Sequence, residues 1–275
     1  MTTLLTTLTR AFDDTAVGQA MRRRRRNRAA DVFLISYPKC GRTWLRMMLG
    51  KAFALHFDLP DANLPLMEFH LLHDVCDRIP RLKATHDDNP QFKTPSELHR
   101  SKGEYRDARV IFLVRDIRDL VVSVYFQMTR RIGRYAGDLP AFLRERRGSV
   151  DSMIRFYNIW ASQRHVPADF LLVRYEDLHA DTAGELRRML EFMPVADVRD
   201  DVITEAVEFA RFENMRKLES SASINRLRPA DKADPESYKT RRGKVGGYVD
   251  YLAPEQAAWL TDRMRDELDP IYRYP

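Results

Sequence analysis

The first residues that could do chemistry lie in the stretch SYPKCGRTW, residues 36–44. It follows an apolar run and precedes an amphipathic one, which is the strand–loop–helix layout of a phosphate-binding loop. Free N–H groups and the helix dipole favour a phosphate at such a helix start. Lys39 precedes the single glycine of the stretch, Gly41, whereas the common nucleoside-triphosphate loop has its lysine after the glycines. The stretch predicts a phosphate site of another kind, although an ordinary strand-to-helix turn also fits these residues alone.

A second pair of candidates, Arg115 and Ser123, lies in VIFLVRDIRDLVVSVYF, residues 110–126. Arg115 ends an apolar strand, where a guanidinium is costly unless an anion or a carboxylate pairs with it. Ser123 follows about two turns into the next predicted helix. The two side chains could hold one phosphate between them. A structural ion pair of Arg115 with Asp116 or Asp119 is the alternative.

The elements that must position these residues alternate along the chain. Nearly all-apolar runs predict buried strands at 32–36, 109–115 and 170–175, because parallel strands covered on both faces lose the apolar–polar alternation. Three-four spacing of apolar residues predicts helices at 42–56, 119–128, 152–164, 182–193, 197–210 and 254–268. The pattern predicts one α/β domain with a mainly parallel central sheet flanked by helices. Ligands collect at the carboxyl ends of such strands.

This domain is expected to span residues 29–275 and to follow a basic arm, residues 1–28. The arm combines a short segment that could be an amphipathic helix with the arginine run MRRRRRNR, residues 21–28. A solvated, partly disordered arm and a patch that contacts an anionic membrane surface both fit this composition.

The composition limits the kinds of binding partner and the cellular location that we expect. A formal net charge of +6 favours polyanions, namely nucleotides, nucleic acid, acidic glycans or a membrane surface. Two cysteines without metal-ligand spacing argue against a disulfide framework and favour a reducing cytoplasm. No run approaches the ~20 apolar residues of a membrane span, and the N-terminus lacks the charge order of a secretory signal. We therefore expect a cytoplasmic protein, with peripheral membrane contact left open.

The ordered motifs together resemble the PAPS-dependent sulfotransferases of the cytosolic type, in a bacterial-like member (PAPS is 3′-phosphoadenosine-5′-phosphosulfate). YPKCGRTW resembles their 5′-phosphosulfate loop YPKSGTTW, and RDIRDLVVSVY resembles their 3′-phosphate motif. YEDL (175–178) is similar to their adenine-side segment, while RFENMRK (211–217) and RRGKVGGY (241–248) resemble their later nucleotide motifs.

The resemblance implies transfer of the sulfonate group of PAPS to a hydroxyl acceptor by in-line displacement, without a metal. The nucleotide product is PAP, which is PAPS without its sulfonate group. It implies that His86, at the end of the short run RLKAT, is the general base, and that Lys39 and Ser123 share in catalysis. The nucleotide-binding residues it implies are Lys39, Cys40, Gly41, Arg42, Thr43, Trp44, Arg115, Ser123, Tyr175, Phe212, Arg241, Arg242 and Gly243.

Several positions depart from the family pattern, three of them in the phosphosulfate loop and before the candidate base. Cys40 stands in place of a serine and Arg42 in place of a threonine, and Ala84 occupies the place of a lysine that Lys83 now precedes. Because Cys40 lies beside Lys39 at a helix N-terminus, a setting that favours thiolate, we expect its alkylation to be slowed by bound nucleotide.

Two further functions stay open at this point. A P-loop kinase or NTPase would find at most Thr43 and Asp116 for its magnesium, and a nucleotide-binding protein without catalysis would also fit. Nucleic acid is not expected as a partner. The acceptor could be a small molecule, a glycan or a lipid, and the arginine-rich stretch 129–150 suggests an anionic one. Residues 129–150 and 219–247 are expected to be mobile loops that shape its pocket. A homodimer is left open.

Overall fold

Four parallel strands form the central sheet of the computed structural model, which describes residues 30–59, 68–221 and 229–275. The strand order is β2-β1-β3-β4, with bounds β1 Val32–Ser36, β2 Leu82–Thr85, β3 Arg109–Val114 and β4 Asp169–Arg174. All three strand pairs are parallel. The predicted α/β fold with a parallel sheet is confirmed. The predictions for residues 1–28 fall outside the described residues.

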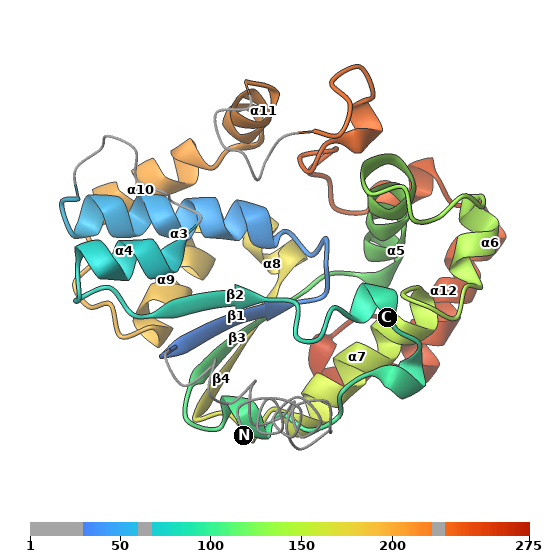
Figure 1. Cartoon of the computed structure of the whole chain (residues 1–275), viewed down its shortest axis with the longest axis horizontal. Helices are drawn as coiled ribbons and strands as arrows, with labels where there is room; N and C mark the ends of the chain where they lie inside the picture. Colours follow the sequence, from blue (N-terminus) through green and yellow to red (C-terminus); the bar gives the residue numbers. More distant parts are fainter. Residues whose placement is uncertain (1–29, 60–67, 222–228) are drawn as a thin grey trace, which may run out of the picture.

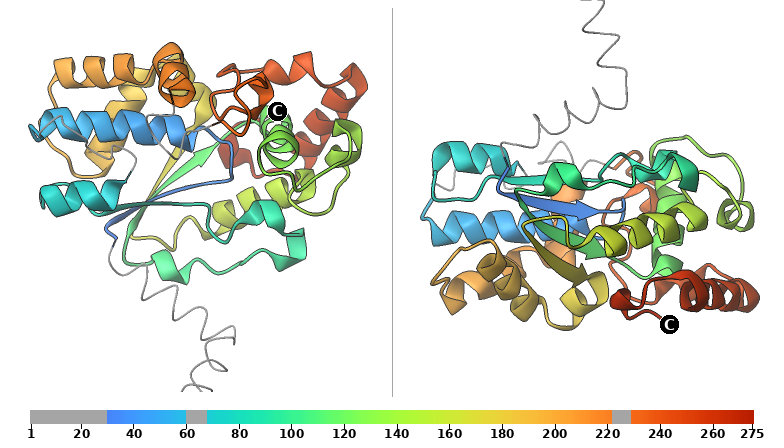
Figure 2. Two further views of the ribbon diagram at one scale, coloured as in Figure 1. Left: turned by 45° about the horizontal axis from the view of Figure 1, so that its top comes forward. Right: turned by 90° about the horizontal axis from the view of Figure 1, so that it is seen from below.

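The helices gather in two groups around this sheet (Figure 1). One group contains α3 (Arg42–His56), α4 (Phe69–Val75), α8 (Tyr175–Ala180), α9 (Thr182–Phe192), α10 (Asp200–Phe209) and α11 (Phe212–Ser220). The other contains α5 (Ile117–Phe126), α6 (Leu139–Leu143), α7 (Val150–Gln163) and α12 (Pro254–Glu267). Both views in Figure 2 keep the two groups apart. None of the helices in the described part of the chain has the length and apolarity to cross a membrane.

The core explains why the strand sequences do not alternate. All five residues of β1 are fully buried, because helices cover the faces of the sheet and β2 and β3 pair with the two edges of the strand. Phe112 of β3 stacks on Trp160 of α7 with 5.2 Å between ring centroids. A polar side chain at either face of such a strand would lose its hydration, so apolar residues occupy consecutive positions.

The stretches expected to be mobile loops contain short helical elements among the described residues, which were not predicted from the sequence. Residues 127–131 continue α5 as a π-helical turn, and α6 follows with Leu139 and Phe142 in the core. In the second stretch, Glu219 in the last turn of α11 is fully buried, and short helical turns lie at Pro235–Ser237 and Gly247–Asp250. The high arginine and glycine content of these stretches predicted loops, because only a few of their residues are buried. Residues 222–228 fall outside the described part.

Candidate active site

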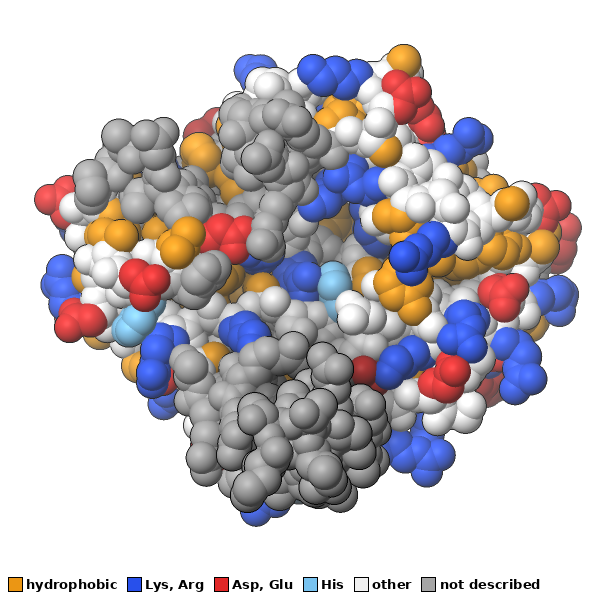
Figure 3. Space-filling view, in the orientation of Figure 1, with side chains coloured by type: hydrophobic (Ala, Val, Ile, Leu, Met, Phe, Trp, Pro, Cys, Tyr) orange, Lys and Arg blue, Asp and Glu red, His pale blue; other side chains and the backbone are white. Residues whose placement is uncertain are grey.

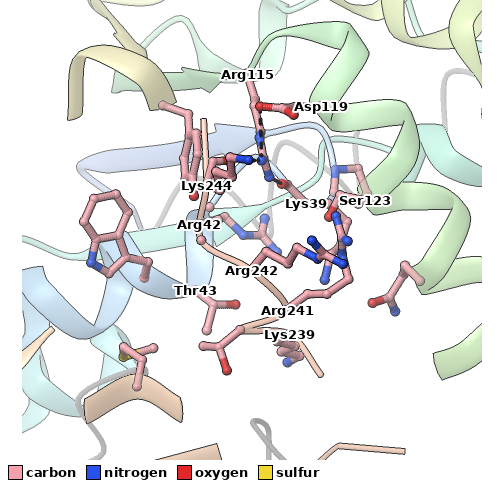
Figure 4. A pocket seen from close by; sticks show the side chains of 18 of the residues that line it. Lys39, Arg42, Thr43, Arg115, Asp119, Ser123, Lys239, Arg241, Arg242 and Lys244 are labelled. Atoms are coloured by element: carbon pink, nitrogen blue, oxygen red, sulfur yellow. Dashed lines mark hydrogen bonds and ion pairs between the residues drawn. The ribbon is translucent and has the colours of Figure 1, made fainter. Parts of the chain in front are cut away.

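A cavity of about 580 Å³ opens at the carboxyl ends of the strands. Figure 3 shows a histidine and several basic side chains in a hollow on this face of the molecule. The lining includes, with the exception of Cys40, every residue that the sequence predicted for the site: Lys39, Gly41, Arg42, Thr43, Trp44, His86, Arg115, Ser123, Tyr175, Phe212, Arg241, Arg242 and Gly243. Figure 4 shows basic side chains from the loop after β1, from the end of β3 and from the segment 239–244 around one space.

The loop after β1 has a backbone that few residues tolerate. Lys39 and Gly41 have φ angles of 77° and 95°. A Cβ atom at Gly41 would lie 2.6 Å from Cδ2 of Tyr175, so only glycine fits both the angle and the space. The carbonyl of Gly41 accepts the first hydrogen bond of α3, from the N–H of Leu45 at 3.1 Å. The turn therefore aims the free N–H groups of a 15-residue helix at the cavity.

Lys39 is held in a setting that disfavours its charge. Burial, together with the positive charges of Arg131, Lys239 and Arg241, lowers the pKa of its ammonium group to about 7. An anion in the cavity would counter both effects, because it would replace lost hydration and offset the neighbouring cations.

Cys40 is the predicted site residue that the structure corrects. Its side chain is fully buried, and its thiol lies 3.4 Å from the hydroxyl of Tyr157. That hydroxyl also accepts from the N–H of Arg115 and donates to its carbonyl. Burial raises the pKa of the Cys40 thiol to about 12, so the expectation of a thiolate facing the nucleotide was wrong. The helix N-terminus lies close by, but loss of hydration outweighs it.

The buried position of Cys40 makes its thiol slow to react. We expect iodoacetamide to alkylate Cys40 slowly at pH 8, with or without PAP, because the thiol is buried and protonated. The half-buried Cys76 should react first. Peptide mass spectrometry at timed intervals measures both rates, and a Cys76→Ser variant isolates the Cys40 signal. Rapid labelling of Cys40 that PAP suppresses would restore the original expectation.

Arg115 forms one of the two ion pairs that were the alternative to phosphate binding, and it also lines the cavity. It forms an ion pair with Asp119 at 3.5 Å, and its Nη2 donates to the carbonyl of Lys244 at 3.1 Å. Its guanidinium lies over the ring of Tyr175, 4.3 Å from the centroid. It nevertheless lines the cavity with Ser123 of α5. The other alternative, a pair with Asp116, is wrong, because Asp116 pairs with Arg118 at 2.6 Å.

His86 follows β2 and is fixed by two contacts. Its Nδ1 lies 2.9 Å from the carbonyl oxygen of Ser36, which can only accept, so Nδ1 carries the proton. Its Nε2 then accepts from Nη2 of Arg42 at 2.7 Å. Burial and the positive charge of Arg42 lower the pKa of the imidazole well below its usual value of about 6.5. The ring is therefore neutral at pH 7, with its lone pair on Nε2.

The loop that follows His86 is anchored in the core. Asp87 is buried and accepts hydrogen bonds from Lys102 at 2.6 Å, Tyr105 at 2.8 Å and Trp160 at 3.0 Å. Asp87 itself has a φ angle of 44°, a region that aspartate and asparagine visit more readily than most residues. These contacts hold the backbone next to His86, and the Ser36 carbonyl orients its ring.

Two buried carboxylates attach the segment 239–248 over the cavity. Glu219 accepts from the N–H groups of Lys239 at 2.6 Å and Thr240 at 2.8 Å. Asp119 accepts from those of Gly246 and Tyr248, each at 2.8 Å. This attachment brings Lys239, Thr240, Arg241, Arg242, Gly243 and Lys244 into the lining of the cavity.

The two predicted arginines of this segment are engaged by carboxylates as well. Arg241 donates to Glu236 at 3.1 Å, and Arg242 donates to Asp250 at 3.1 Å. Both still line the cavity. Their guanidinium groups are therefore positioned in advance at its edge.

One end of the cavity is aromatic. Trp44 and Tyr175 both contact His179, with ring centroids 4.8 Å and 4.6 Å apart. Phe212 lines the same cavity, and a Cβ atom at Gly243 would lie 2.5 Å from its ring. Flat side chains in this arrangement could contact a planar base.

Sequence reasoning missed several lining residues. Arg46, His179, Lys239, Thr240 and Asp119 were not among the predicted site residues, although all line the cavity. Arg46 lies one helical turn after Arg42, and Lys239 directly precedes the RRGKVGGY motif, so extending each motif by a few residues would have found them. Lys83, the displaced lysine, lies over the ring of Phe33 and is outside the described lining of the cavity.

Comparisons with known proteins agree with this architecture. A family model described as a sulfotransferase domain matches residues 29–271. Cytosolic sulfotransferase 10 of Arabidopsis thaliana is 26% identical over 278 residues, covering 88% of this chain and 76% of that protein. Flavonol 3-sulfotransferase of Flaveria bidentis is 26% identical over 272 residues, covering 88% and 80%. The crystal structure of mouse sulfotransferase SULT7A1 complexed with PAP has a similar fold, with a TM-score of 0.60, 21% identity and coverage of 89% and 87%.

Proposed function

The chain belongs to the family of sulfotransferase-domain proteins, and on this basis we propose that it transfers the sulfonate group of PAPS to a hydroxyl of an acceptor. One observation carries the proposal. Lys39 follows β1, His86 follows β2 and Arg115 follows β3, and the three side chains line a single cavity. A phosphate-binding loop, a neutral imidazole and a buried guanidinium are the groups that this transfer requires.

The chemistry assigned to the site is an in-line displacement at sulfur. Nε2 of His86 takes the proton of the acceptor hydroxyl while the acceptor oxygen bonds to sulfur and the bond from sulfur to the 5′-phosphate oxygen breaks. The products are the sulfate ester and PAP, and the proton resides on His86. Lys39 and the N–H groups at the start of α3 stabilise the negative charge that develops on the leaving oxygen.

The remaining residues hold the nucleotide in this proposal. Arg115 and Ser123 bind the 3′-phosphate, and Arg241, Arg242 and Gly243 approach it from the segment 239–248. Trp44, Tyr175 and Phe212 contact the adenine. The proximity of all three groups of residues within one cavity supports this assignment. Fixing the donor at both phosphates aligns the sulfur with the base, which is where proximity contributes to rate.

Incubation with PAPS tests the proposed activity directly. Cell extract, enzyme and PAPS are combined, and mass spectrometry searches for species heavier by one sulfonate group, while released PAP is quantified in parallel. A Lys39→Met variant controls for other enzymes in the extract. Product that depends on PAPS and on Lys39 supports the proposal. PAP binding without any sulfonated product would favour a nucleotide-binding protein without catalysis.

Family membership argues against the P-loop kinase alternative. A kinase would respond to ATP and magnesium and ignore PAPS. The same assay with ATP in place of PAPS separates the two activities. The cytoplasmic location, the membrane contact of residues 1–28 and a homodimer stay predictions.

Lys39 predicts a pH dependence of nucleotide binding. Because the pKa of Lys39 is lowered to about 7 in the free protein, and bound phosphates raise it again, binding above pH 7 requires uptake of a proton. PAP affinity is therefore highest near pH 7 and falls by up to about tenfold per pH unit above it, where the phosphates are already ionised.

Isothermal titration calorimetry between pH 7 and 9 measures this effect, and two buffers of different ionisation enthalpy count the protons. Lys39→Met should remove most of the slope, leaving a smaller contribution from Lys239, whose pKa burial lowers to about 8. Lys232→Met, at an exposed position, is the matched control. Equal affinity at pH 7 and pH 9 in the wild type would contradict the prediction.

A further inference from the structure

Arg42 lies where the resembled family has a threonine, and in this fold it contacts the candidate base. Its Nη2 donates to Nε2 of His86 at 2.7 Å, so the nitrogen that would take the acceptor proton is already hydrogen-bonded. Its Nη1 is buried and has no hydrogen-bond partner among the described residues. A buried N–H of a charged group is unfavourable when it makes no hydrogen bond. This half of the guanidinium would therefore be stabilised by a ligand atom that accepts a hydrogen bond from it.

The charges that face His86 have one sign. Arg42 and Arg46 approach it from α3 and Lys239 approaches it from the segment 239–248, and the charge of each lowers its pKa. Among the described residues that line the cavity, Asp119 carries the single carboxylate, and that carboxylate pairs with Arg115 and two backbone N–H groups. Glu219, behind the segment, accepts from its N–H groups and from Arg131. The charged groups that act on the pKa of His86 are therefore cations.

We propose that the acceptor carries an oxyanion group close to its reacting hydroxyl, and that this group binds Arg42 and draws it from His86. Arg46 and Lys239 line the same cavity, and their positive charges favour an anion there. The oxyanion is a carboxylate, a sulfate or a phosphate, each of which accepts two parallel hydrogen bonds from a guanidinium. The inference rests on the proposed sulfonate transfer and specifies its substrate class.

Such binding would couple substrate choice to base strength. While Arg42 donates to Nε2, that lone pair is less available to the proton of the acceptor hydroxyl, so transfer is slower. Once an oxyanion accepts from Arg42, Nε2 is released and the positive charge beside the ring is offset. The imidazole then becomes a stronger base, because the pKa of His86 returns toward its usual value. A neutral acceptor would leave Arg42 on the base.

A matched pair of ligands tests the anion site. The probes are 2-hydroxyphenylacetate and its neutral amide, added to the complex of the enzyme with PAP, so that the nucleotide phosphates already occupy their own sites. NMR of the protein labelled with ¹⁵N-histidine follows the His86 ring signals. We expect the carboxylate to bind about tenfold or more tightly than the amide, as for a hydrogen-bonded charge pair, and to shift the Nε2 signal.

Arg42→Thr should abolish this preference, while Arg199→Thr, which removes an exposed arginine on the surface, keeps it. A second readout is the pH profile of transfer from PAPS to the amide. Arg42→Thr should move its acidic limb to higher pH, because a cation next to His86 is lost. A variant that merely disturbs packing would lower the rate without moving the limb.

Three results overturn the proposal. Equal affinities for the carboxylate and the amide, or no saturable shift at His86, would exclude an anion site beside the base. A loss in Arg42→Thr that is equal for both probes and accompanied by a higher KM for PAPS would assign Arg42 to the sulfonate of the donor. Failure of the wild type to bind PAP would reject the proposed function itself, and calorimetry with PAP alone identifies that outcome before any acceptor is added.

Discussion

Replacing His86 with alanine is expected to lower sulfonate transfer by roughly 10²–10⁴-fold, the contribution of a positioned general base. The acceptor hydroxyl is almost un-ionised at pH 7, and His86 is the imidazole of the cavity that carries its lone pair on Nε2. PAP affinity should stay within a few-fold of the wild type, because the ring belongs to the acceptor side of the proposal. Single-turnover transfer from PAPS, with calorimetry for PAP, measures both quantities.

The exposed His165, which lies outside the cavity, provides the matched control as His165→Ala. The pH profile of the wild type tests the direction of the pKa shift of His86. Because the pKa of His86 is lowered, its neutral form persists below pH 6.5, and kcat/KM should stay constant from pH 7 down through pH 6.5 before it declines. A His86→Ala enzyme with turnover within a few-fold of the wild type would remove His86 from the mechanism.

Replacing Glu219 with alanine is expected to destabilise the protein and to weaken PAP binding by about tenfold or more. Glu219 is fully buried and accepts from two N–H groups of the segment 239–248, from the Thr240 hydroxyl at 2.6 Å and from Arg131. Alanine leaves these buried donors unpaired. Removing one partner of a buried charged network costs about 3–5 kcal/mol.

That loss corresponds to a fall in melting temperature of about 10 °C for a chain of this size. Differential scanning calorimetry and PAP titration measure the two effects. Glu219→Gln keeps the volume and one carbonyl oxygen, so its effects should be smaller. Glu213→Ala, an exposed position on the same helix α11, serves as the control for helix propensity. Wild-type PAP affinity in Glu219→Ala would mean that the segment 239–248 keeps its place without this carboxylate.

The fold was predictable because its strands and long helices have local signatures. β1 and α3 have the predicted bounds of 32–36 and 42–56, and the ends of the other predicted strands and helices differ by at most three residues. Several short helices were not predicted. α4, α8 and α11 have seven, six and nine residues, too few for a clear period against their surroundings. Tertiary packing stabilises helices of this length more than their own propensity does.

The candidate site was predictable in part, because the loop at Lys39 and Arg115 follow strand ends and parallel strands end at one edge of the sheet. The sequence by itself therefore determined where these two groups lie, whereas His86 as candidate base and the segments 211–217 and 241–248 came from the family resemblance. Their contacts depend on segments far apart in the chain. Only the tertiary structure decided that Cys40 is a buried thiol, that Glu219 anchors the segment 239–248, and that Arg42 donates to His86. Burial and neighbouring charge set these properties, and both arise only when distant residues pack together.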